Sequence, residues 1–267
     1  MNEWAIYEVG ASLRREFLQE ENPRRDFVIP GASAEQLMSR GYTQQDGLGH
    51  RFSLDGPDRY FTAAIEMPMA GKRPHVQPLA AASLEQDLAR RDLTINAMAR
   101  DASGQVIDPF GGQQDLADGR LRHINDQFAN DPLRLLRTAR LAAQYAHWGF
   151  RLAHGTANIL KAMAVDERLQ ALTDALIEEE LQLAMVSPTP SRFLSTLARC
   201  GAFELLFPEA RATGDCFPSS SHDADLPAWM KTLDSSGKLG SKDGMHQRLS
   251  VLSEQFGEAF INRWFQR

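Results

Sequence analysis

The spacing of apolar residues changes once along this chain, near residue 125. Before that point, short runs rich in β-branched and aromatic residues alternate with segments of helical period, which is typical of an α/β or α+β unit. Ser33 and Gln36 stand at capping-box spacing and predict the start of one of its helices. We expect strands at 4–9, 27–29, 51–54 and 59–66, and helices at 11–21 and 34–40.

Beyond that point the helical period dominates. Pro132 stands in the first turn of a segment whose apolar residues recur at helical spacing. Residues 209–245 lose this period and are rich in Gly and Ser, which predicts loops or disorder. We expect helices at 132–141, 157–163, 166–185 and 191–200, and a final amphipathic helix at 245–265.

These patterns divide the chain into three regions. The first, over residues 1–125, is an α/β or α+β unit in which strands and helices alternate. The second, over residues 126–208, is all-helical. We expect residues 209–267 to be partly disordered, with one final helix.

The composition excludes several classes of protein. The chain has 267 residues, 43% hydrophobic and 24% charged, which suffices for an ordinary core. No run approaches the ~18 apolar residues of a membrane helix, and no signal segment is visible. Two isolated cysteines, Cys200 and Cys216, argue against a disulfide scaffold or zinc cluster and predict reduced thiols in a cytoplasmic protein. Because the net charge is −6, a polyanion would have to meet a local basic patch.

The densest group of polar side chains lies in residues 90–99, whose sequence is RRDLTINAMA. Arginine forks such as that of Arg91 match phosphate oxygens bidentately. Asp92 and Asn96 suit the hydroxyls of a ribose. Asn96 could equally be a satisfied buried amide that joins the sheet to the next helix.

Two further segments follow in order. The turn DPFGG occupies residues 108–112. On a helix, Asp131 and Arg134 would share a face and offer an acceptor pair and a donor fork, the equipment to read the edge of a base. Arg134, Arg137 and Arg140 would form a basic stripe, which by itself could also be a solvated face paired to acidic neighbours.

These three segments, in this order and spacing, resemble the signature of class II tRNA nucleotidyltransferases and poly(A) polymerases, the CCA-adding family. The resemblance extends over roughly residues 6–208. It implies that residues 1–125 form a nucleotidyltransferase head with a mixed sheet flanked by helices. It also implies an all-helical neck over residues 126–208 and a shortened C-terminal region over residues 209–267. It also implies transfer of a nucleoside monophosphate from CTP or ATP to an RNA 3′ end, such as that of tRNA, with Mg²⁺ as cofactor.

The resemblance assigns roles to single residues. Arg91 would contact the nucleotide phosphates and Asp92 the ribose, while Asp131 and Arg134 would read the base. Residues 108–112 would form a flexible link between head and neck. One departure is Asn130, which stands where the family has Glu. The implied nucleotide-binding set is Gly10, Arg14, Arg91, Asp92, Asn96, Asp131, Arg134, Arg137 and Arg140.

The family's metal carboxylates lie in an Asp-x-Asp pattern on the second strand. Here Asp26 matches the second carboxylate, and Arg24 takes the place of the first. A guanidinium does not ligate a cation, so Arg24 would repel Mg²⁺ or pair with Asp26 or with a bound phosphate. Asp26 is therefore the sole candidate for the catalytic and metal-binding carboxylate. We hypothesise that nucleotide or RNA-end binding persists while metal-dependent transfer is weak or absent.

Three functions stay open at this point: a metal-dependent nucleotidyltransferase, a non-catalytic nucleotide- or RNA-binding pseudoenzyme with a regulatory role, and a folded remnant without activity. A second copy of the chain or a helper subunit is a further possible partner. The acidic run 178–180 is expected to be a solvated helix face rather than a metal site.

Overall fold

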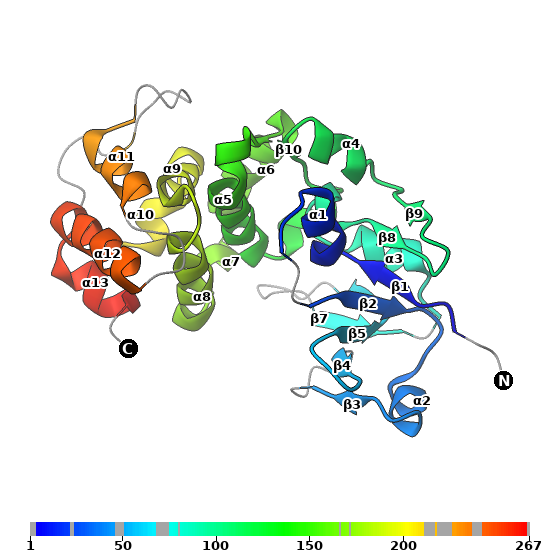
Figure 1. Ribbon diagram of the computed structural model, residues 1–267. Helices are drawn as coiled ribbons and strands as arrows, with labels where there is room; N and C mark the ends of the chain where they lie inside the picture. Colours follow the sequence, from blue (N-terminus) through cyan, green and yellow to red (C-terminus); the bar gives the residue numbers. More distant parts are fainter. Residues whose placement is uncertain are drawn as a thin grey trace. The chain divides into compact units, whose positions relative to one another are not determined.

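The chain forms two compact units, Met1–Asp131 and Pro132–Arg267. The computed structural model describes residues 4–21, 24–45, 51–67, 75–79, 81–165, 167–170, 172–210, 217, 226–236 and 242–265. Each unit is described by itself below (Figure 1).

A seven-stranded mixed sheet forms the centre of the first unit, as the sequence predicted. Strands β2 and β5 are parallel, and the other neighbouring pairs are antiparallel. Two further strands, β6 (Ala64–Met67) and β7 (His75–Pro78), pair antiparallel as a separate small sheet. The order in the main sheet is β3 (Thr43–Gln44), β4 (Arg51–Ser53), β5 (Arg59–Thr62), β2 (Asp26–Ile29), β1 (Tyr7–Val9), β8 (Ala99–Arg100) and β9 (Val106–Ile107).

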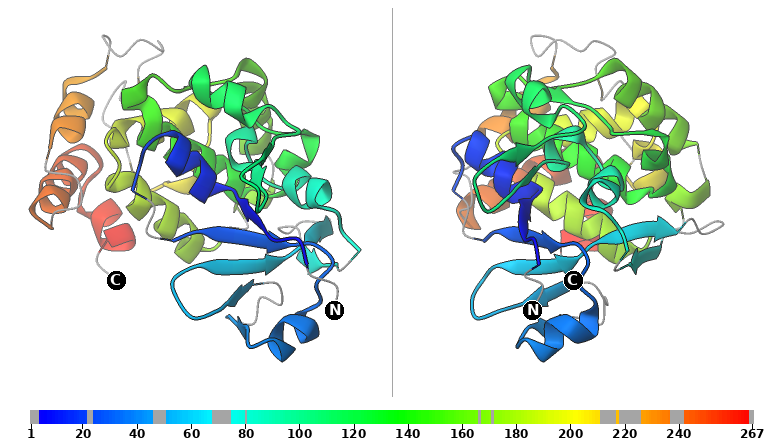
Figure 2. Two further views of the ribbon diagram at one scale, coloured as in Figure 1. Left: turned by 45° about the vertical axis from the view of Figure 1, so that its right-hand side comes forward. Right: turned by 90° about the vertical axis from the view of Figure 1, so that its right-hand side faces the viewer.

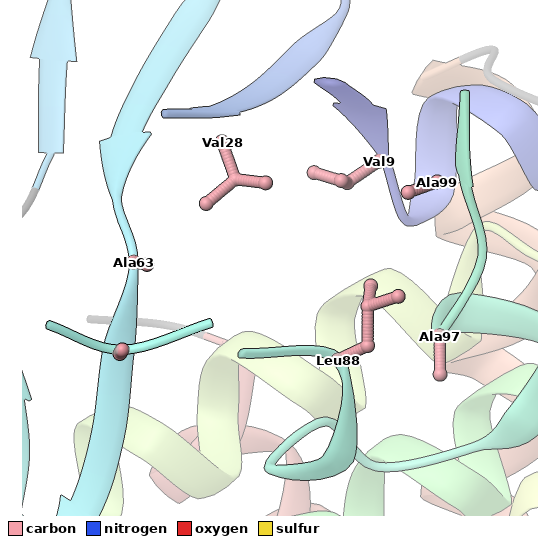
Figure 3. Packing of buried hydrophobic residues seen from close by; sticks show 7 residues of the cluster. Val9, Val28, Ala63, Leu88, Ala97 and Ala99 are labelled. Carbon is pink, nitrogen blue, oxygen red and sulfur yellow. The ribbon is translucent and has the colours of Figure 1, made fainter. Parts of the chain in front are cut away.

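Two apolar clusters anchor this sheet. Neighbouring residues of β2 point to opposite faces, so Val28 belongs to one cluster and Ile29 to the other. Figure 3 shows the first cluster, in which Val9, Val28 and Leu88 approach one another. The second gathers Ile29, Ala32, Leu37 and Phe52.

Short helices complete the first unit. They are α1 (Ala11–Phe17), α2 (Ala34–Ser39), α3 (Leu84–Ala89), α4 (Gly112–Ala117) and the 3₁₀ turns η1 (Thr94–Asn96) and η2 (Asp126–Asn130), with strand β10 (Arg120–Leu121). The capping box of Ser33 and Gln36 at α2 is confirmed. Ser83 and Gln86 form a second one at α3, which sequence reasoning missed.

The second unit is helical, as expected for a neck (Figure 2). Its central helix α5 (Leu133–Tyr145) packs against α8 (Asp174–Met185) and α9 (Pro190–Cys200). The other elements are η3 (Ala146–Trp148), β11 (Arg151–Leu152), α6 (His154–Ala164), α7 (Glu167–Gln170), α10 (Phe203–Leu206), α11 (Ala228–Ser235), α12 (Lys242–Phe256) and α13 (Glu258–Phe265).

Several predicted boundaries were wrong. The strand expected at 59–66 is interrupted at Ala63, and the helix expected at 166–185 is two helices, α7 and α8. The final helix breaks at Gly257, whose φ of 86° is left-handed. Helix α11 lies within the stretch predicted as loops, where residues 211–216, 218–225 and 237–241 are outside the described part.

Two expectations from composition concern the thiols and the membrane. Cys200 is a free, buried thiol, and its burial raises its pKa to about 11. Cys216 lies outside the described residues. Among the helices that the structure describes, none is both long and apolar enough to span a bilayer.

Candidate nucleotide-binding site

A tight turn joins β1 to α1 at Gly10. Its φ is +72°, and its amide donates to the Met98 carbonyl at 3.3 Å. A Cβ added at Gly10 would lie 2.6 Å from Nη1 of Arg91. The turn therefore needs glycine twice over, for its left-handed backbone and for the close approach of a guanidinium.

Asp87, a residue that sequence reasoning missed, holds this guanidinium in place. Its Oδ2 accepts from Nη2 of Arg91 at 2.9 Å, and its Oδ1 accepts from Nε and Nη2 of Arg90 at 3.0 and 2.7 Å. The carboxylate is fully buried and also accepts from the Ala64 amide at 3.3 Å. Burial alone would raise the pKa of Asp87, but the charges and hydrogen bonds of Arg91 and Arg90 lower it below its ordinary value. In the sequence, Arg90 and Arg91 follow Asp87 by three and four residues. This helical spacing was the signal that could have predicted the two ion pairs.

The Arg91 fork is only partly used by the protein. Its Nη1 makes one long hydrogen bond, 3.5 Å, to the Asn96 carbonyl. Its Nε is buried and has no hydrogen-bond partner among the described residues. An unsatisfied buried donor is uncommon in a native fold and suits an anionic ligand.

Asn96 links two further residues of the expected set. Its Oδ1 accepts from Nη1 of Arg14, a buried residue of α1, and its Nδ2 donates to Asp92 Oδ1 at 2.7 Å. The same Asp92 oxygen accepts from the Leu93 amide at 2.7 Å. The oxygen and the nitrogen of the Asn96 amide thus each have a protein partner. These contacts are the ones expected if Asn96 is a satisfied amide that holds the fold together. A role of Asn96 in binding a ribose stays a prediction.

The turn 108–112 is held firmly inside the first unit. Asp108 accepts from the amides of Gly112 and Gln113 at 2.7 and 2.9 Å and so caps α4. A Cβ at Gly112 would lie 2.4 Å from the Thr94 carbonyl oxygen. The two units divide at Asp131, so the turn lies within the first unit, and the flexible link implied for it stays a prediction.

Asp26 is engaged by an arginine that the sequence did not point to. Its Oδ1 and Oδ2 accept from Nε and Nη2 of Arg59, each at 2.6 Å. Arg24, the partner considered from sequence, is exposed, and Arg25 pairs with Asp58 at 3.5 Å.

These residues do not fit a divalent cation. Both oxygens of Asp26 already accept from a guanidinium, and the residue two positions earlier is the cationic Arg24. Throughout the described ranges, no group of three or more His, Cys, Asp or Glu side chains could hold a metal ion. We therefore derive no chemical step through a metal at this site.

Asp131 and Arg134, the two residues expected to read the base, do not lie on one helical face as predicted. Asp131 precedes the helix with an extended backbone, φ −108° and ψ 104°, because α5 begins only at Leu133. It therefore shares no helical face with Arg134, which is 3% exposed.

The stripe of arginines is bound to an acidic residue of the same unit. Nε of Arg137 and Nε of Arg140 donate to the two carboxylate oxygens of Glu180 at 3.1 and 2.6 Å. Glu180 is 5% exposed, so the prediction of a solvated acidic face at 178–180 was wrong for this residue. Because α5 and α8 pack together, the opposite charges meet inside the unit.

Comparisons with known proteins give concordant matches. Residues 6–122 match the family described as Poly A polymerase head domain. A Multifunctional CCA protein of Pseudomonas paraeruginosa is 39% identical over 236 residues, which are 85% of this chain and 56% of that protein. The chain thus spans little more than half the length of that relative.

Solved structures share the fold. A tRNA-processing enzyme in an apo form superimposes with a TM-score of 0.72 at 24% identity, over 98% of this chain and 74% of that one. A structure of a tRNA-processing enzyme with CTP superimposes with a TM-score of 0.64 at 25% identity, over 80% and 57%.

Proposed function

Because this chain belongs to the family of tRNA nucleotidyltransferases and poly(A) polymerases, we propose that it binds CTP or ATP and acts at the 3′ end of tRNA. In nucleotidyl transfer, the 3′-oxygen of the RNA joins the α-phosphorus and pyrophosphate leaves. We also propose that the protein is located in the cytoplasm, where it would encounter tRNA 3′ ends.

One observation carries the binding step: the Arg91 fork lies against Gly10, with Asp87 holding it from behind. The glycine lets the Arg91 guanidinium lie against the backbone of the turn, where its charge suits a phosphate. The Arg91 side chain is 18% exposed, and its Nη1 makes one long hydrogen bond of 3.5 Å among the residues described, which leaves donor capacity that suits a phosphate oxygen.

The neighbouring polar side chains suit the sugar. Arg14, Asn96 and Asp92 are connected by hydrogen bonds, which would hold the Asp92 carboxylate in place for a ribose hydroxyl. Asp131 and Arg134 stay candidates for reading the base on the resemblance alone. Any anion that approaches Arg137 or Arg140 must compete with Glu180.

The Asp26–Arg59 ion pair favours a second candidate function, binding of nucleotide or RNA without transfer. In this case the protein would regulate or protect tRNA ends as a pseudoenzyme. Both candidates share the nucleotide-binding step and differ only in whether a nucleotide is incorporated.

A titration with labelled CTP and ATP tests the shared step. We expect binding by the wild type and a loss of about tenfold or more in Arg91→Met, because a hydrogen bond to a charged group contributes roughly 1.5–3 kcal/mol. Arg120→Met is the matched control, since Arg120 forms only an exposed pair with Asp118. No binding of either nucleotide, or equal affinity in Arg91→Met, would contradict the proposal.

Incorporation into tRNA that ends before CCA separates the two candidates. Label in the product that depends on Asp26 supports the transferase. Binding without incorporation, with either Mg²⁺ or Mn²⁺ present, supports the pseudoenzyme.

A further inference from the structure

The pairing of Asp26 with Arg59 is built into the sheet. Strands β2 and β5 are parallel neighbours, and their register places Asp26 directly beside Arg59 as the first residue of each strand. Residues opposite each other in adjacent strands project from the same face, so the two side chains start close together. Chance contact between flexible surface side chains would not give this placement.

The geometry of the pair is that of a matched fork. Two hydrogen bonds of 2.6 Å join Nε and Nη2 of Arg59 to the two oxygens of Asp26. The side chains are only 28% and 15% exposed, so solvent screens the pair less than a surface salt bridge. A planar guanidinium satisfies both carboxylate oxygens at once and keeps its charge at any ordinary pH.

The surrounding charges favour anions over metal ions. Residues 24–26 and 58–59 carry three arginines and two aspartates, and Arg25 forms a pair with Asp58. Arg24 is exposed. A divalent cation that approached Asp26 would therefore have to displace one guanidinium in the vicinity of two others.

We propose that Arg59 is a built-in cation that occupies the place of a divalent metal beside Asp26, so that this site binds its nucleotide without a metal ion. The second clause rests on the proposed function, because it concerns the same nucleotide. The first clause concerns the protein alone and can be tested without nucleotide.

Direct binding of Mn²⁺ to the full chain, measured by electron paramagnetic resonance of the free ion, tests the first clause. Arg59→Leu frees both oxygens of Asp26 from charge-assisted hydrogen bonds and removes one positive charge beside them. The variant should therefore bind Mn²⁺ about tenfold or more tightly than the wild type.

Two further variants locate the effect. The double variant Arg59→Leu with Asp26→Asn should lose the gain, because the carboxylate is then absent. Arg25→Leu removes the same charge from a neighbouring pair, Arg25–Asp58, and should raise Mn²⁺ affinity only a few-fold, well below the rise in Arg59→Leu, because both oxygens of Asp26 stay paired. If Arg59→Leu does not fold, Arg59→Gln makes the same test with a polar side chain.

The inference is overturned if the wild type already binds Mn²⁺ as tightly as Arg59→Leu and loses it in Asp26→Asn. It is equally overturned if folded Arg59→Leu or Arg59→Gln gains nothing. A failure to bind CTP would instead count against the proposed function and leave the Mn²⁺ result unaffected.

Discussion

Two parts of the first unit use the same chemical pair with opposite consequences. At the turn after β1, a buried carboxylate, Asp87, holds two arginines, one of which, Arg91, we propose as the ligand-binding residue. At the start of β2, an arginine, Arg59, occupies both oxygens of a carboxylate, Asp26. We propose that the first arrangement presents a guanidinium to an anionic ligand. In the second, the guanidinium of Arg59 takes the place that a metal ion would have beside Asp26.

This difference shows why burial matters more than residue type. Asp87 is inaccessible and serves only to orient its arginines, whereas Asp26 is at a more open position where a partner decides its role. Comparison with the family's motifs alone would overlook Asp87, which lies outside them, and would count Asp26 as a retained carboxylate of the Asp-x-Asp pattern. From the contacts we propose Arg91 instead as the charge that meets the ligand.

Loss of the Asp87 charge should have the largest effect. Asp87→Asn leaves Arg90 and Arg91 without their buried partner, and we expect the free energy of unfolding to fall by about 3–5 kcal/mol. Glu85→Gln, an exposed position on the same helix, should change it by less than about 0.5 kcal/mol. Urea unfolding measures both. A loss no larger than that of the control would show that the charge of Asp87 does not stabilise the two arginines.

The same residue predicts a pH dependence. The folded-state pKa of Asp87 is below the ordinary 3.8, so its stabilising contribution is full above 3.8 and is lost as the pH falls through the folded-state value. The wild type should therefore lose more stability than Asp87→Asn when the pH is lowered through this range. Parallel stability curves for the two proteins would show that the shift is absent.

A smaller effect is expected at the glycine turn. Gly10→Ala adds a methyl group 2.6 Å from Nη1 of Arg91, while Gly31→Ala has a similar φ of +81° and no atom within 4 Å. Both should lose about 1–2 kcal/mol from the left-handed backbone. Only Gly10→Ala should also weaken CTP binding, by about tenfold, since it displaces the fork. Equal CTP affinity in the two variants would separate Arg91 from the ligand.

The smallest effect concerns Arg24. Arg24→Asp restores the carboxylate that the family pattern has at this position, but Arg59 still occupies Asp26. Mn²⁺ affinity should therefore rise only a few-fold in Arg24→Asp, well below the rise in Arg59→Leu. A rise in Arg24→Asp as large as that in Arg59→Leu would identify Arg24 as the blocking residue.

Local signals in the sequence predicted much of the fold. The capping box at Ser33, the helical period after Pro132 and the run of strand-forming residues at 27–29 each depend on residues a few positions apart. The mixed sheet and the helical neck follow from such signals. The breaks at Ala63 and Gly257 are local departures that periodicity averages out.

The site was predictable only in part. Gly10, Arg14, Arg91, Asp92 and Asn96 lie together in the structure, as residues of one motif set should. The Arg59–Asp26 and Glu180–Arg140 pairs join residues 33 and 40 positions apart, and only strand register and helix packing bring them together. The sequence does not display either. The prediction that Asp131 and Arg134 share a helical face was wrong because the helix starts two residues after Asp131.

We propose that nucleotide binding depends on the Arg91 fork and not on a metal at Asp26. Calorimetric titration of the full chain with CTP, once with Mg²⁺ and once with a chelator, tests this dependence. We expect the same affinity in both conditions and a loss in Arg91→Met. Binding that requires Mg²⁺ and disappears in Asp26→Asn would contradict it.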